Sequence, residues 1–335
     1  MDQLTLMDCT LRDGGNVVGK GFPADITDMV LDGLTACHVS IIELGNSGGI
    51  GAYEVAGFTN ALTDMEYLDL VQPYLGKSEI GMFLNAKRYR EKNVDLAAEH
   101  GLSFLRVGAD AGDGDIALTA IADMKKRNLK AFYSAMKAYL LTPAELAEEA
   151  KKLEAAGLDE YTIMDSAGTM LPDQAAAYTE ALADALSIPV AFHCHNNLGL
   201  SAANALAAAQ NGAKILDCGL MGMARSAGNL PTEVCVAMMQ RHGQMMDVDL
   251  FGMLDFIENR LQPAMETHNY HNPITPTDLT LGFSGCHSSF LKLFRQTATE
   301  KKVNLFRLIT EVSAVNQKNP SAQLIEETAD RLLSE

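Results

Sequence analysis

Short apolar runs alternate with longer alanine-rich segments along most of the chain. The short runs are rich in Val, Ile, Leu and Phe, which favours strands, whereas the longer segments repeat apolar positions at helical spacing. The runs that predict strands are residues 4–10, 39–45, 79–84, 103–108, 130–136, 161–166, 190–195 and 214–219. The segments that predict helices include 24–37, 92–100, 114–127, 143–156, 172–186, 199–211 and 229–242. This alternation is typical of a parallel sheet covered by helices.

Residues at the ends of the helical segments support these limits. Pro143 follows Thr142 and Pro172 follows Leu171, and proline is favoured at the first position of a helix. Glycines in EHGL, AAGL and QNGA come where the helices 92–100, 143–156 and 199–211 are expected to end, since glycine readily adopts the left-handed conformation found there.

The number of strand–helix units predicts how the sheet is organised. Eight units within residues 4–242 favour a closed (β/α)8 TIM barrel. An open doubly wound sheet is the alternative, but no G-x-G-x-x-G loop follows the first predicted strand. The alternation stops after residue 245. We therefore expect a catalytic barrel over residues 1–245 and a C-terminal helical region over 246–335, which includes the proline-rich segment HNYHNPITPTD (268–278).

Composition narrows the class of protein further. The chain has 335 residues, 47% hydrophobic and 21% charged, which suits a large buried core. Its net charge of −17, with no compensating basic stripe, disfavours nucleic-acid binding. The sequence contains no apolar run long enough to cross a membrane, no secretory signal, and six scattered cysteines without a C-x-x-C pair. We expect a cytoplasmic enzyme with buried thiols and no membrane association.

Polar residues gather where the predicted strands end. The C-terminal ends of the strands form the active-site face of a TIM barrel. The residues found there are Arg12, Asp13, Glu43, Asp165, Ser166, His193, His195, Arg225 and Asn229. Each of them alone could be a helix cap, a turn residue or a surface ion pair. Together they predict a functional site, because a packed barrel does not gather this many polar groups at one rim without a use for them.

The segment FHCHNNLG (192–199) places two histidines two positions apart. Side chains alternate along a strand, so His193 and His195 would face one side while Cys194 faces the other. The pair could bind a divalent metal ion or could simply lie at the end of a strand. With a carboxylate nearby, two imidazoles suit Zn²⁺, Co²⁺ or Fe²⁺, whereas Mn²⁺ and Mg²⁺ prefer more oxygen ligands. The residues alone indicate a divalent metal without identifying it.

Five segments, in order along the chain, resemble the DRE-TIM metallolyases, a superfamily of metal-dependent barrels that act on pyruvate. The segments are DCTLRDGG (8–15), IIELG (41–45), MDSAGTMLP (164–172), HCHNNLGLSAANALAA (193–208) and GLMGMARSAGNLPTE (219–233). The resemblance implies that Asp13, His193 and His195 bind the metal, most commonly Mn²⁺ or Mg²⁺. Asn229 would be an additional or outer ligand.

The same resemblance implies roles for other rim residues. Arg12 would stabilise a pyruvate enolate, and Glu43 would orient Arg12. Ser166 would bind the substrate carboxylate, and Asn16 would also contact the substrate. Metal and guanidinium both suit this chemistry, because cleavage of a 4-hydroxy-2-oxo acid leaves a negative charge on the enolate oxygen.

Two branches of the superfamily fit the chain to different degrees. Acyl-CoA-condensing members, such as isopropylmalate synthases, usually carry a glutamine or a similar polar residue in the segment where this chain has Gly15 and Asn16. The segment GFSGCHSSFLKLF (282–294) resembles instead a C-terminal motif of the 4-hydroxy-2-oxovalerate aldolases, with His287 in place of a tyrosine. We therefore expect a class II pyruvate aldolase in which the C-terminal region completes the active site.

One position departs from the aldolase pattern. The general base of these aldolases is a histidine at the position that is Asn16 here, and an amide does not accept a proton near neutral pH. We expect His287 to act as the base, since an imidazole titrates close to neutral pH. The alternative is that His287 only donates a hydrogen bond.

Other functions stay open at this point. A Claisen-type acyl-CoA condensing enzyme or lyase, related to HMG-CoA lyase, would use the same barrel. A Schiff-base aldolase would use Lys137, at the end of the fifth predicted strand. A catalytically degenerate barrel would serve a partner subunit. For the aldolase, the resemblance implies a 2-oxo acid and an aldehyde as ligands, a homo-oligomer, and an aldehyde-consuming dehydrogenase as a possible partner.

Overall fold

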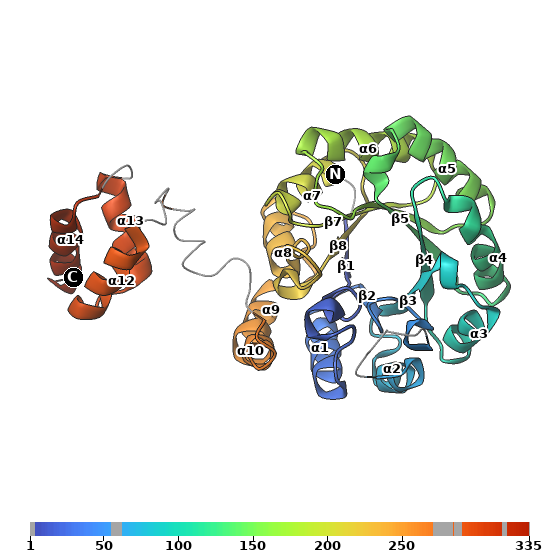
Figure 1. The fold of residues 1–335 in the computed structure, drawn as a ribbon, viewed down its shortest axis with the longest axis horizontal. Helices are drawn as coiled ribbons and strands as arrows, with labels where there is room; N and C mark the ends of the chain where they lie inside the picture. Colours follow the sequence, from blue (N-terminus) through green and yellow to red (C-terminus); the bar gives the residue numbers. More distant parts are fainter. Residues whose placement is uncertain (1–3, 55–61, 271–283, 285–289, 317–319, 335) are drawn as a thin grey trace. The chain divides into compact units, whose positions relative to one another are not determined.

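A closed barrel of parallel strands forms the centre of the larger part of the protein. The computed structural model describes residues 4–54, 62–270, 284, 290–316 and 320–334. Within these residues, eight strands follow one another around the barrel in chain order, and β8 closes onto β1 (Figure 1). The strands are β1 Thr5–Asp8, β2 Ile41–Leu44, β3 Glu79–Asn85, β4 Phe104–Asp110, β5 Lys130–Met136, β6 Glu160–Asp165, β7 Val190–Cys194 and β8 Ile215–Cys218. The predicted TIM barrel is confirmed.

A helix follows each strand and covers the outside of the barrel (Figure 1). These helices are α1 Ala24–Ala36, α2 Asp64–Val71, α3 Glu91–Glu99, α4 Leu118–Lys126, α5 Pro143–Ala155, α6 Pro172–Ala185, α7 Ser201–Gln210 and α8 Thr232–Arg241. The sequence pattern predicted no helix between the second and third strands. Helix α2 is short, and it begins with a capping box in which Thr63 and Glu66 satisfy each other's backbone amides. Burial of Tyr67 and Leu68 holds it against the barrel.

Side chains that point into the barrel form layers of different chemistry. The lowest layer is apolar and buried, and it consists of Met7, Ile41, Phe104, Phe132, Ala191 and Ile215. Two residues further along their strands, at the next inward positions, come Glu43, Arg106, His193 and Asp217. The alternation of the strands thus places a charged layer directly above an apolar floor.

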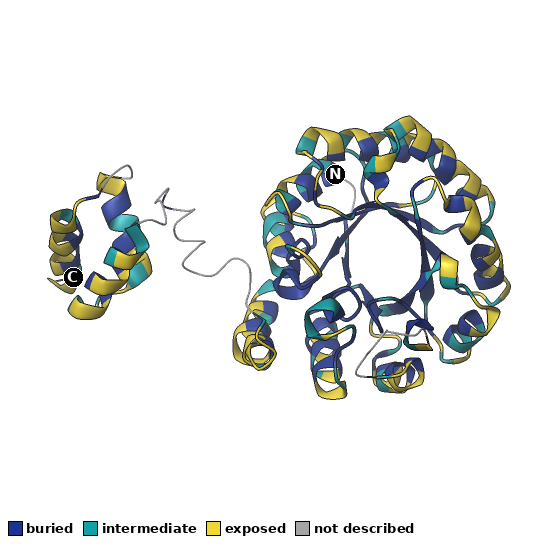
Figure 2. Cartoon of the chain, viewed as in Figure 1, coloured by how far each residue is buried: buried dark blue, intermediate teal, exposed yellow. Residues whose placement is uncertain are grey.

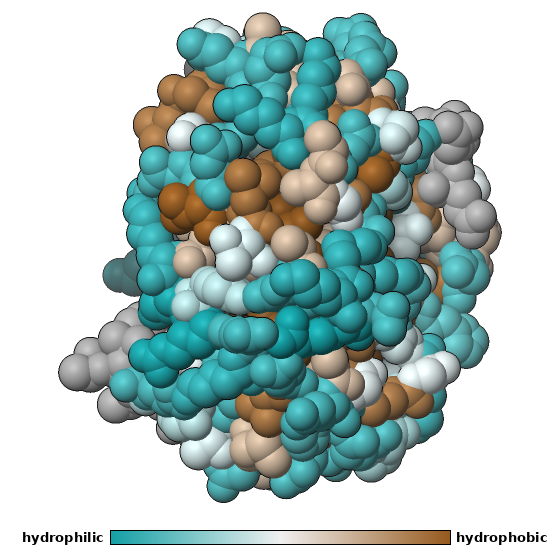
Figure 3. Space-filling model, turned by 90° about the vertical axis from the view of Figure 1, so that its right-hand side faces the viewer, coloured by the Kyte–Doolittle hydropathy of each residue, from teal (hydrophilic) through white to brown (hydrophobic). Residues whose placement is uncertain are grey.

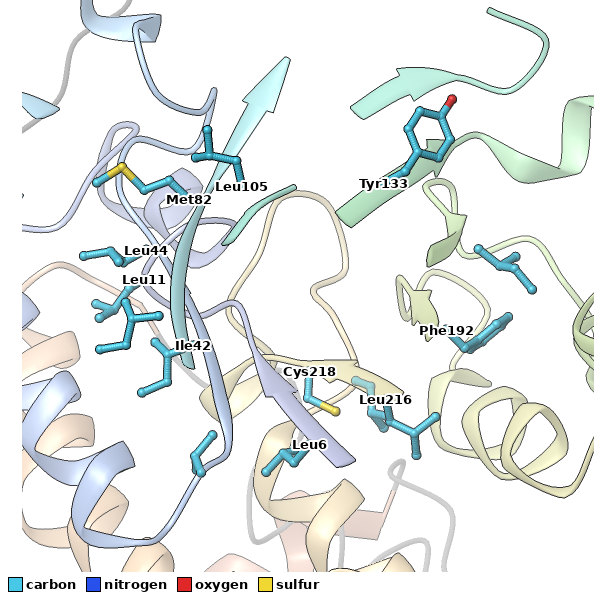
Figure 4. Close-up of a cluster of buried hydrophobic side chains, with 14 of the residues drawn as sticks. Leu6, Leu11, Ile42, Leu44, Met82, Leu105, Tyr133, Phe192, Leu216 and Cys218 are labelled. Atoms are coloured by element: carbon cyan, nitrogen blue, oxygen red, sulfur yellow. The ribbon is translucent and has the colours of Figure 1, made fainter. Parts of the chain in front are cut away.

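The residues between these inward positions face the helices. Figure 4 shows Leu6, Ile42 and Leu216 among the hydrophobic side chains that pack on the outer side of the strands. The strands are buried except at some of their end residues, whereas the outer faces of the helices are exposed (Figure 2). On the face seen in Figure 3, hydrophilic side chains predominate and hydrophobic ones show between them. In the described residues, no helix combines the length and apolar character needed to cross a membrane.

The barrel unit extends beyond the boundary at residue 245 that the sequence suggested. The compact unit runs to Tyr270, because α9 (Leu250–Phe256), a π-helical turn (Ile257–Leu261) and α10 (Gln262–Glu266) pack on the barrel. Gly33 in α1 makes this contact possible, since a Cβ there would lie 2.7 Å from the Phe256 ring. The end of the strand–helix alternation at 245 does not mark the end of the hydrophobic core.

Residues His271–Glu335 form a second compact unit. Its described helices are α12 (Leu291–Lys301), α13 (Leu305–Val315) and α14 (Ala322–Ser334). They enclose a small core of their own, formed by Phe294, Ala298, Leu308, Ile309, Val312, Ile325 and Ala329. The helical character expected for this region is therefore present.

Candidate active site

Asp13 and two histidines meet at the C-terminal ends of β1 and β7. The Nε2 atoms of His193 and His195 each lie 3.8 Å from Oδ2 of Asp13, and all three side chains are buried. Strand β7 ends at Cys194 rather than at residue 195 as predicted. His195 keeps its position because it pairs with Asn229 in an isolated bridge. The structure thus brings together the three residues that the sequence suggested as metal ligands.

The protonation states of these groups favour metal binding. Burial, followed by the nearby His193, lowers the pKa of His195 to about 4, so its imidazole is neutral at pH 7. Burial alone would raise the pKa of Asp13, but Arg12 and the two imidazoles outweigh it and hold that pKa well below its usual value. An ionised carboxylate and a neutral imidazole are the forms that coordinate a divalent cation.

A buried aspartate supports His193 from the barrel interior. Oδ2 of Asp217 lies 2.9 Å from Nδ1 of His193, on the side of the ring away from Asp13. Such a carboxylate fixes the ring orientation and leaves Nε2 for a metal. Asp217 was not among the predicted site residues, although a charged residue within the mostly apolar run KILDCG is a signal that the sequence contains. Cys9 also approaches His193 and Asp217. Burial raises the pKa of its thiol well above the usual value, which disfavours the thiolate needed for coordination.

A second buried network holds Arg12 in place. Glu43 lies at its centre: Arg12 Nε donates to Oε2 at 2.5 Å, and Arg106 donates to Oε1 at 2.8 Å and to Oε2 at 2.6 Å. Arg106 also pairs with Asp217, so the charges continue without a break to His193. The predicted role of Glu43 in orienting Arg12 fits this contact. Arg106 was missed, although it too is a charged residue in a predicted apolar strand.

The guanidinium of Arg12 is held in place by its neighbours, but one of its nitrogen atoms forms no hydrogen bond with the described residues. It stacks 5.1 Å from the centroid of the Phe83 ring, and its Nη1 lies 3.2 Å from Asp13. Burial would lower the pKa of Arg12, but Glu43 and Asp13 raise it above its usual value, so the charge is permanent. Its buried Nη2 atom has no hydrogen-bond partner among the described residues. A charged donor is therefore available to a ligand.

Two asparagines flank Asp13. Asn229 Nδ2 donates to Oδ2 of Asp13 at 3.0 Å, and its buried Oδ1 has no partner in the described part of the chain. Asn16 Nδ2 donates to the backbone oxygen of Asp13 at 2.8 Å and to Oδ1 at 3.1 Å. Asn229 therefore keeps an unpartnered oxygen on a side chain that contacts Asp13, whereas Asn16 holds both the backbone and the carboxylate of Asp13.

A cavity of about 450 Å³ opens above these residues at the C-terminal rim of the barrel. Its size is in the range of small-molecule sites. The residues that line it are Arg12, Asp13, Lys20, Ser47, Gly48, Phe83, Asn85, Arg88, Met136, Lys137, Tyr139, Met164, Ser166, His195 and Arg225. The cavity therefore contains the predicted enolate-stabilising arginine beside two of the candidate metal ligands.

The residues at the end of β6 differ in their roles. Asp165 accepts hydrogen bonds from the backbone amides of Thr169 and Met170, at 3.0 and 2.9 Å, and so shapes the loop before α6. Ser166 lines the cavity, and its Oγ accepts a hydrogen bond from the Lys137 amide at 2.9 Å. Its hydroxyl proton therefore points elsewhere and is available to a ligand. His287 lies outside the described residues.

The comparisons with known proteins identify the family. A family model described as HMGL-like matches residues 3–258, which cover the whole barrel and α9. This protein belongs to the HMGL-like family. The catalytic residues inferred from the DRE-TIM resemblance all fall within the matched range, apart from His287.

Curated relatives share one activity name. The 4-hydroxy-2-oxovalerate aldolase of Geobacillus genomosp. 3 is 31% identical over 92% of this chain and 91% of its own length. The 4-hydroxy-2-oxovalerate aldolase 2 of Nocardia farcinica is 34% identical over 89% of this chain and 85% of its own. The HMGL-like family member described here is accordingly a carbon–carbon lyase.

Solved structures show the same fold. The N-terminal domain of a candidate aldolase from Bacteroides vulgatus superposes with a TM-score of 0.67 and 22% identity, covering 80% of this chain and 89% of that domain. The carboxyl transferase domain of Rhizobium etli pyruvate carboxylase superposes with a TM-score of 0.68 at 17% identity, covering 99% of this chain and 60% of that one. At these identities the likeness concerns the barrel architecture.

Proposed function

We propose that this protein is a divalent-metal-dependent pyruvate aldolase. It would cleave a 4-hydroxy-2-oxo acid into pyruvate and an aldehyde, or form the acid from them. The observation that carries the proposal is the position of Asp13 and His195 in the same cavity as the unpartnered Nη2 of Arg12. The activity of the curated relatives agrees with this reaction.

The residues at the centre of the site suit a divalent cation. His193, His195 and Asp13 would hold it, with the free Oδ1 of Asn229 as a further ligand or as a contact to bound water. Buried nitrogen and oxygen atoms without hydrogen-bond partners are costly unless a ligand satisfies them. When bound, the cation supplies a Lewis acid for the oxygens of a 2-oxo acid. We propose Mn²⁺ or Mg²⁺, with Zn²⁺ or Co²⁺ as substitutes.

Arg12 would stabilise the enolate that cleavage produces. As the bond between C3 and C4 breaks, its electron pair moves toward the keto oxygen, and negative charge grows there. A charged donor already held by Glu43 and Phe83 needs little rearrangement to meet that charge. Ser166 would donate its hydroxyl proton to the substrate carboxylate, since its Oγ already accepts from the Lys137 amide.

A base must take the proton from the 4-hydroxyl as the aldehyde forms. Asn16 is an amide, and among the described cavity residues the one imidazole is His195, a candidate metal ligand. We therefore propose His287 as the base, on the sequence alone. The enolate then takes up a proton at C3 and becomes pyruvate. In the direction of synthesis the methyl group of pyruvate loses that proton and the base returns one to the new hydroxyl, so no other reactant is consumed.

Lys137 is a weaker candidate for the chemistry. Its Nζ lies 3.0 Å from Asp110 and its side chain is 46% exposed, whereas Schiff-base lysines are commonly desolvated. We keep an aldehyde-consuming dehydrogenase partner, a homo-oligomeric state and a cytoplasmic location as parts of the proposal that rest on the resemblance to the aldolases.

Metal content and turnover of a histidine variant test this proposal. His195→Ala should lose bound divalent metal, measured by elemental analysis after dialysis, and should lose pyruvate release from 4-hydroxy-2-oxovalerate. The fold should stay intact, because the rim does not carry the barrel core. His242→Ala, which removes an exposed histidine after α8, is the matched control and should keep both. Full metal occupancy in His195→Ala would contradict the assignment.

A further inference from the structure

Positive charge is concentrated around the cavity of a protein whose net charge is −17. Among the described residues that line it, five are cations and Asp13 is the one carboxylate. Arg12 is paired with Glu43, and Lys137 is paired with Asp110. Arg88 donates to a backbone carbonyl. The other two cations, Lys20 and Arg225, come from different loops at the rim. Local charge opposite to that of the molecule indicates attraction of an anionic ligand.

Two of these cations share one neutral acceptor. Lys20 Nζ donates to Oδ1 of Asn16 at 3.0 Å, and Arg225 Nη2 approaches the same oxygen at 3.4 Å. Neither side chain forms an ion pair with a carboxylate in the described part of the chain. Two cations on a single amide oxygen repel each other, and an anion placed between them would relieve that repulsion. Asn16, where related aldolases have a histidine, thus connects Asp13 to a pair of cations.

A buried hydroxyl on the cavity wall adds an independent observation. Ser47 is 4% exposed and lines the cavity, and its Oγ has no hydrogen-bond partner among the described residues. Its backbone amide donates to the carbonyl of Lys20 at 2.8 Å, which ties the two segments together. Arg88 Nη2 donates to the next carbonyl, that of Gly48, at 2.7 Å. A donor hydroxyl therefore lies in the segment that joins Lys20 to Arg88.

We propose that the aldehyde handled by this enzyme carries an anionic group, a phosphate or a second carboxylate, which binds at Lys20, Ser47 and Arg225. The inference rests on the proposed aldolase function and names its substrate class. The carboxylate of the 2-oxo acid does not account for these residues, because Arg12, Ser166 and the metal ligands already surround its expected place. Lys20 and Arg225 are therefore available to bind the aldehyde part of the substrate.

Matched pairs of aldehydes test the proposal in the direction of synthesis with pyruvate. Glycolaldehyde phosphate is compared with glycolaldehyde, and succinic semialdehyde with butanal, each for kcat/KM. We expect at least one anionic aldehyde to exceed its neutral counterpart by about tenfold or more, the usual effect of charge-assisted hydrogen bonds. The pair that shows the preference distinguishes phosphate from carboxylate. Equal or better use of both neutral aldehydes would overturn the proposal.

Variants of Lys20 and Arg225 test whether these residues cause the preference for anionic aldehydes. Lys20→Met and Arg225→Met should each reduce the anionic-to-neutral ratio of kcat/KM by about tenfold, mainly through KM for the anionic aldehyde. Lys77→Met, which removes an exposed lysine before β3 at the opposite end of the barrel, should leave the ratio unchanged. An unaltered ratio in both site variants would contradict the subsite.

A measurement without aldehyde separates the two proposals. Exchange of the pyruvate methyl protons for deuterium, in the presence of Mn²⁺, reports enolate formation alone. Exchange together with an absent anionic preference overturns the subsite and leaves the aldolase standing. Absence of exchange and of turnover with every aldehyde overturns both.

Discussion

At the scale of single residues, the site is a continuous set of buried charges. Arg12, Glu43, Arg106, Asp217 and His193 contact one another in that order, from the cavity to a candidate metal ligand. Removing one member of such a network leaves its partner charged, buried and unpaired, which is strongly destabilising. The network therefore fixes the orientation of the two ends at which chemistry is proposed.

Replacing Arg12 by lysine tests what the guanidinium does. Lysine keeps the charge but cannot contact Glu43, the Phe83 face and a ligand with one planar group. We expect Arg12→Lys to lower kcat for cleavage of 4-hydroxy-2-oxovalerate by about 10²–10³, as for other losses of a transition-state donor. Steady-state kinetics measure kcat and KM separately. A change confined to KM would show that Arg12 does not stabilise the transition state.

The buried Glu160 should make the stability of the protein depend on pH. It is the first residue of β6 and 1% exposed, and burial raises its pKa from 4.5 to about 8 despite the opposing effect of Arg106. The folded protein therefore binds a proton that the unfolded chain has released. The contribution of Glu160 to stability is full below about pH 4.5 and is lost as the pH rises to about 8.

Urea unfolding at pH 5 and pH 8 measures this effect. Glu160→Gln removes the titrating group. The free energy of unfolding of the variant, relative to that of the wild type, should therefore be higher at pH 8 than at pH 5. A constant difference between the two proteins at both pH values would mean that Glu160 does not titrate in this window.

At the scale of elements, glycines in the strands make room for the rings that support the site. Gly108 in β4 lies against Phe83 of β3, and a Cβ there would lie 2.4 Å from Cζ of the ring. Phe83 in turn carries the Arg12 guanidinium on its face. Because Gly108 has no side chain, the Phe83 ring can lie where it supports the guanidinium of Arg12, which follows β1.

Gly108→Ala tests this coupling. The added methyl group must displace the Phe83 ring, so we expect the free energy of unfolding to fall by about 1–3 kcal/mol, the usual effect of overpacking. The kcat should fall as well, because Arg12 loses its support. In Gly108→Ala/Phe83→Leu the smaller side chain makes room, and stability should recover in part. A single variant as stable and active as the wild type would show that the barrel accommodates the methyl group.

At the scale of the whole molecule, the chain contains two units with separate hydrophobic cores. The first ends at Tyr270, and it includes Met253, Phe256, Leu261 and Met265, which are buried beyond the last strand–helix pair. The second has its own core among α12, α13 and α14. A division of the chain should therefore follow the cores rather than the end of the repeating pattern.

Two truncations test this division. A fragment of residues 1–270 should unfold cooperatively and bind divalent metal, whereas a fragment of residues 1–245 should be less stable, since each fully buried apolar side chain contributes about 1.5–3 kcal/mol. Thermal unfolding and elemental analysis measure both properties. Equal stability of the two fragments would show that α9 and α10 are dispensable.

The longer fragment lacks His287 and is therefore expected to be inactive in cleavage. Full-length His287→Ala separates loss of the proposed base from loss of the second unit, and its cleavage rate should fall by about 10²–10⁴. Wild-type turnover by either protein would rule out His287 as the base.

The sequence by itself determined the local features of this protein. Apolar periodicity predicted the eight strands and most helices, because alternation and helical spacing are properties of neighbouring residues. The spacing of His193 and His195 placed them on one face for the same reason. The motifs around Arg12 and Asp13 then indicated the family and the rim at which chemistry was expected. The sequence pattern extended β7 one residue too far and predicted no helix at α2, where a bridge from His195 to Asn229 and a capping box decide the structure.

The tertiary structure alone decided which residues act together. Arg106 and Asp217 are far apart in the chain and meet because β8 closes the barrel onto β1, which brings their inward positions to one level. The end of the first unit depended on Phe256 packing over Gly33, a contact that no local pattern records. Lys20 and Arg225 likewise come together at Asn16 from opposite ends of the barrel sequence. Local sequence patterns specify the strands and helices. Closure of the barrel decides which side chains contact one another, because it sets the distances between residues that are far apart in the sequence.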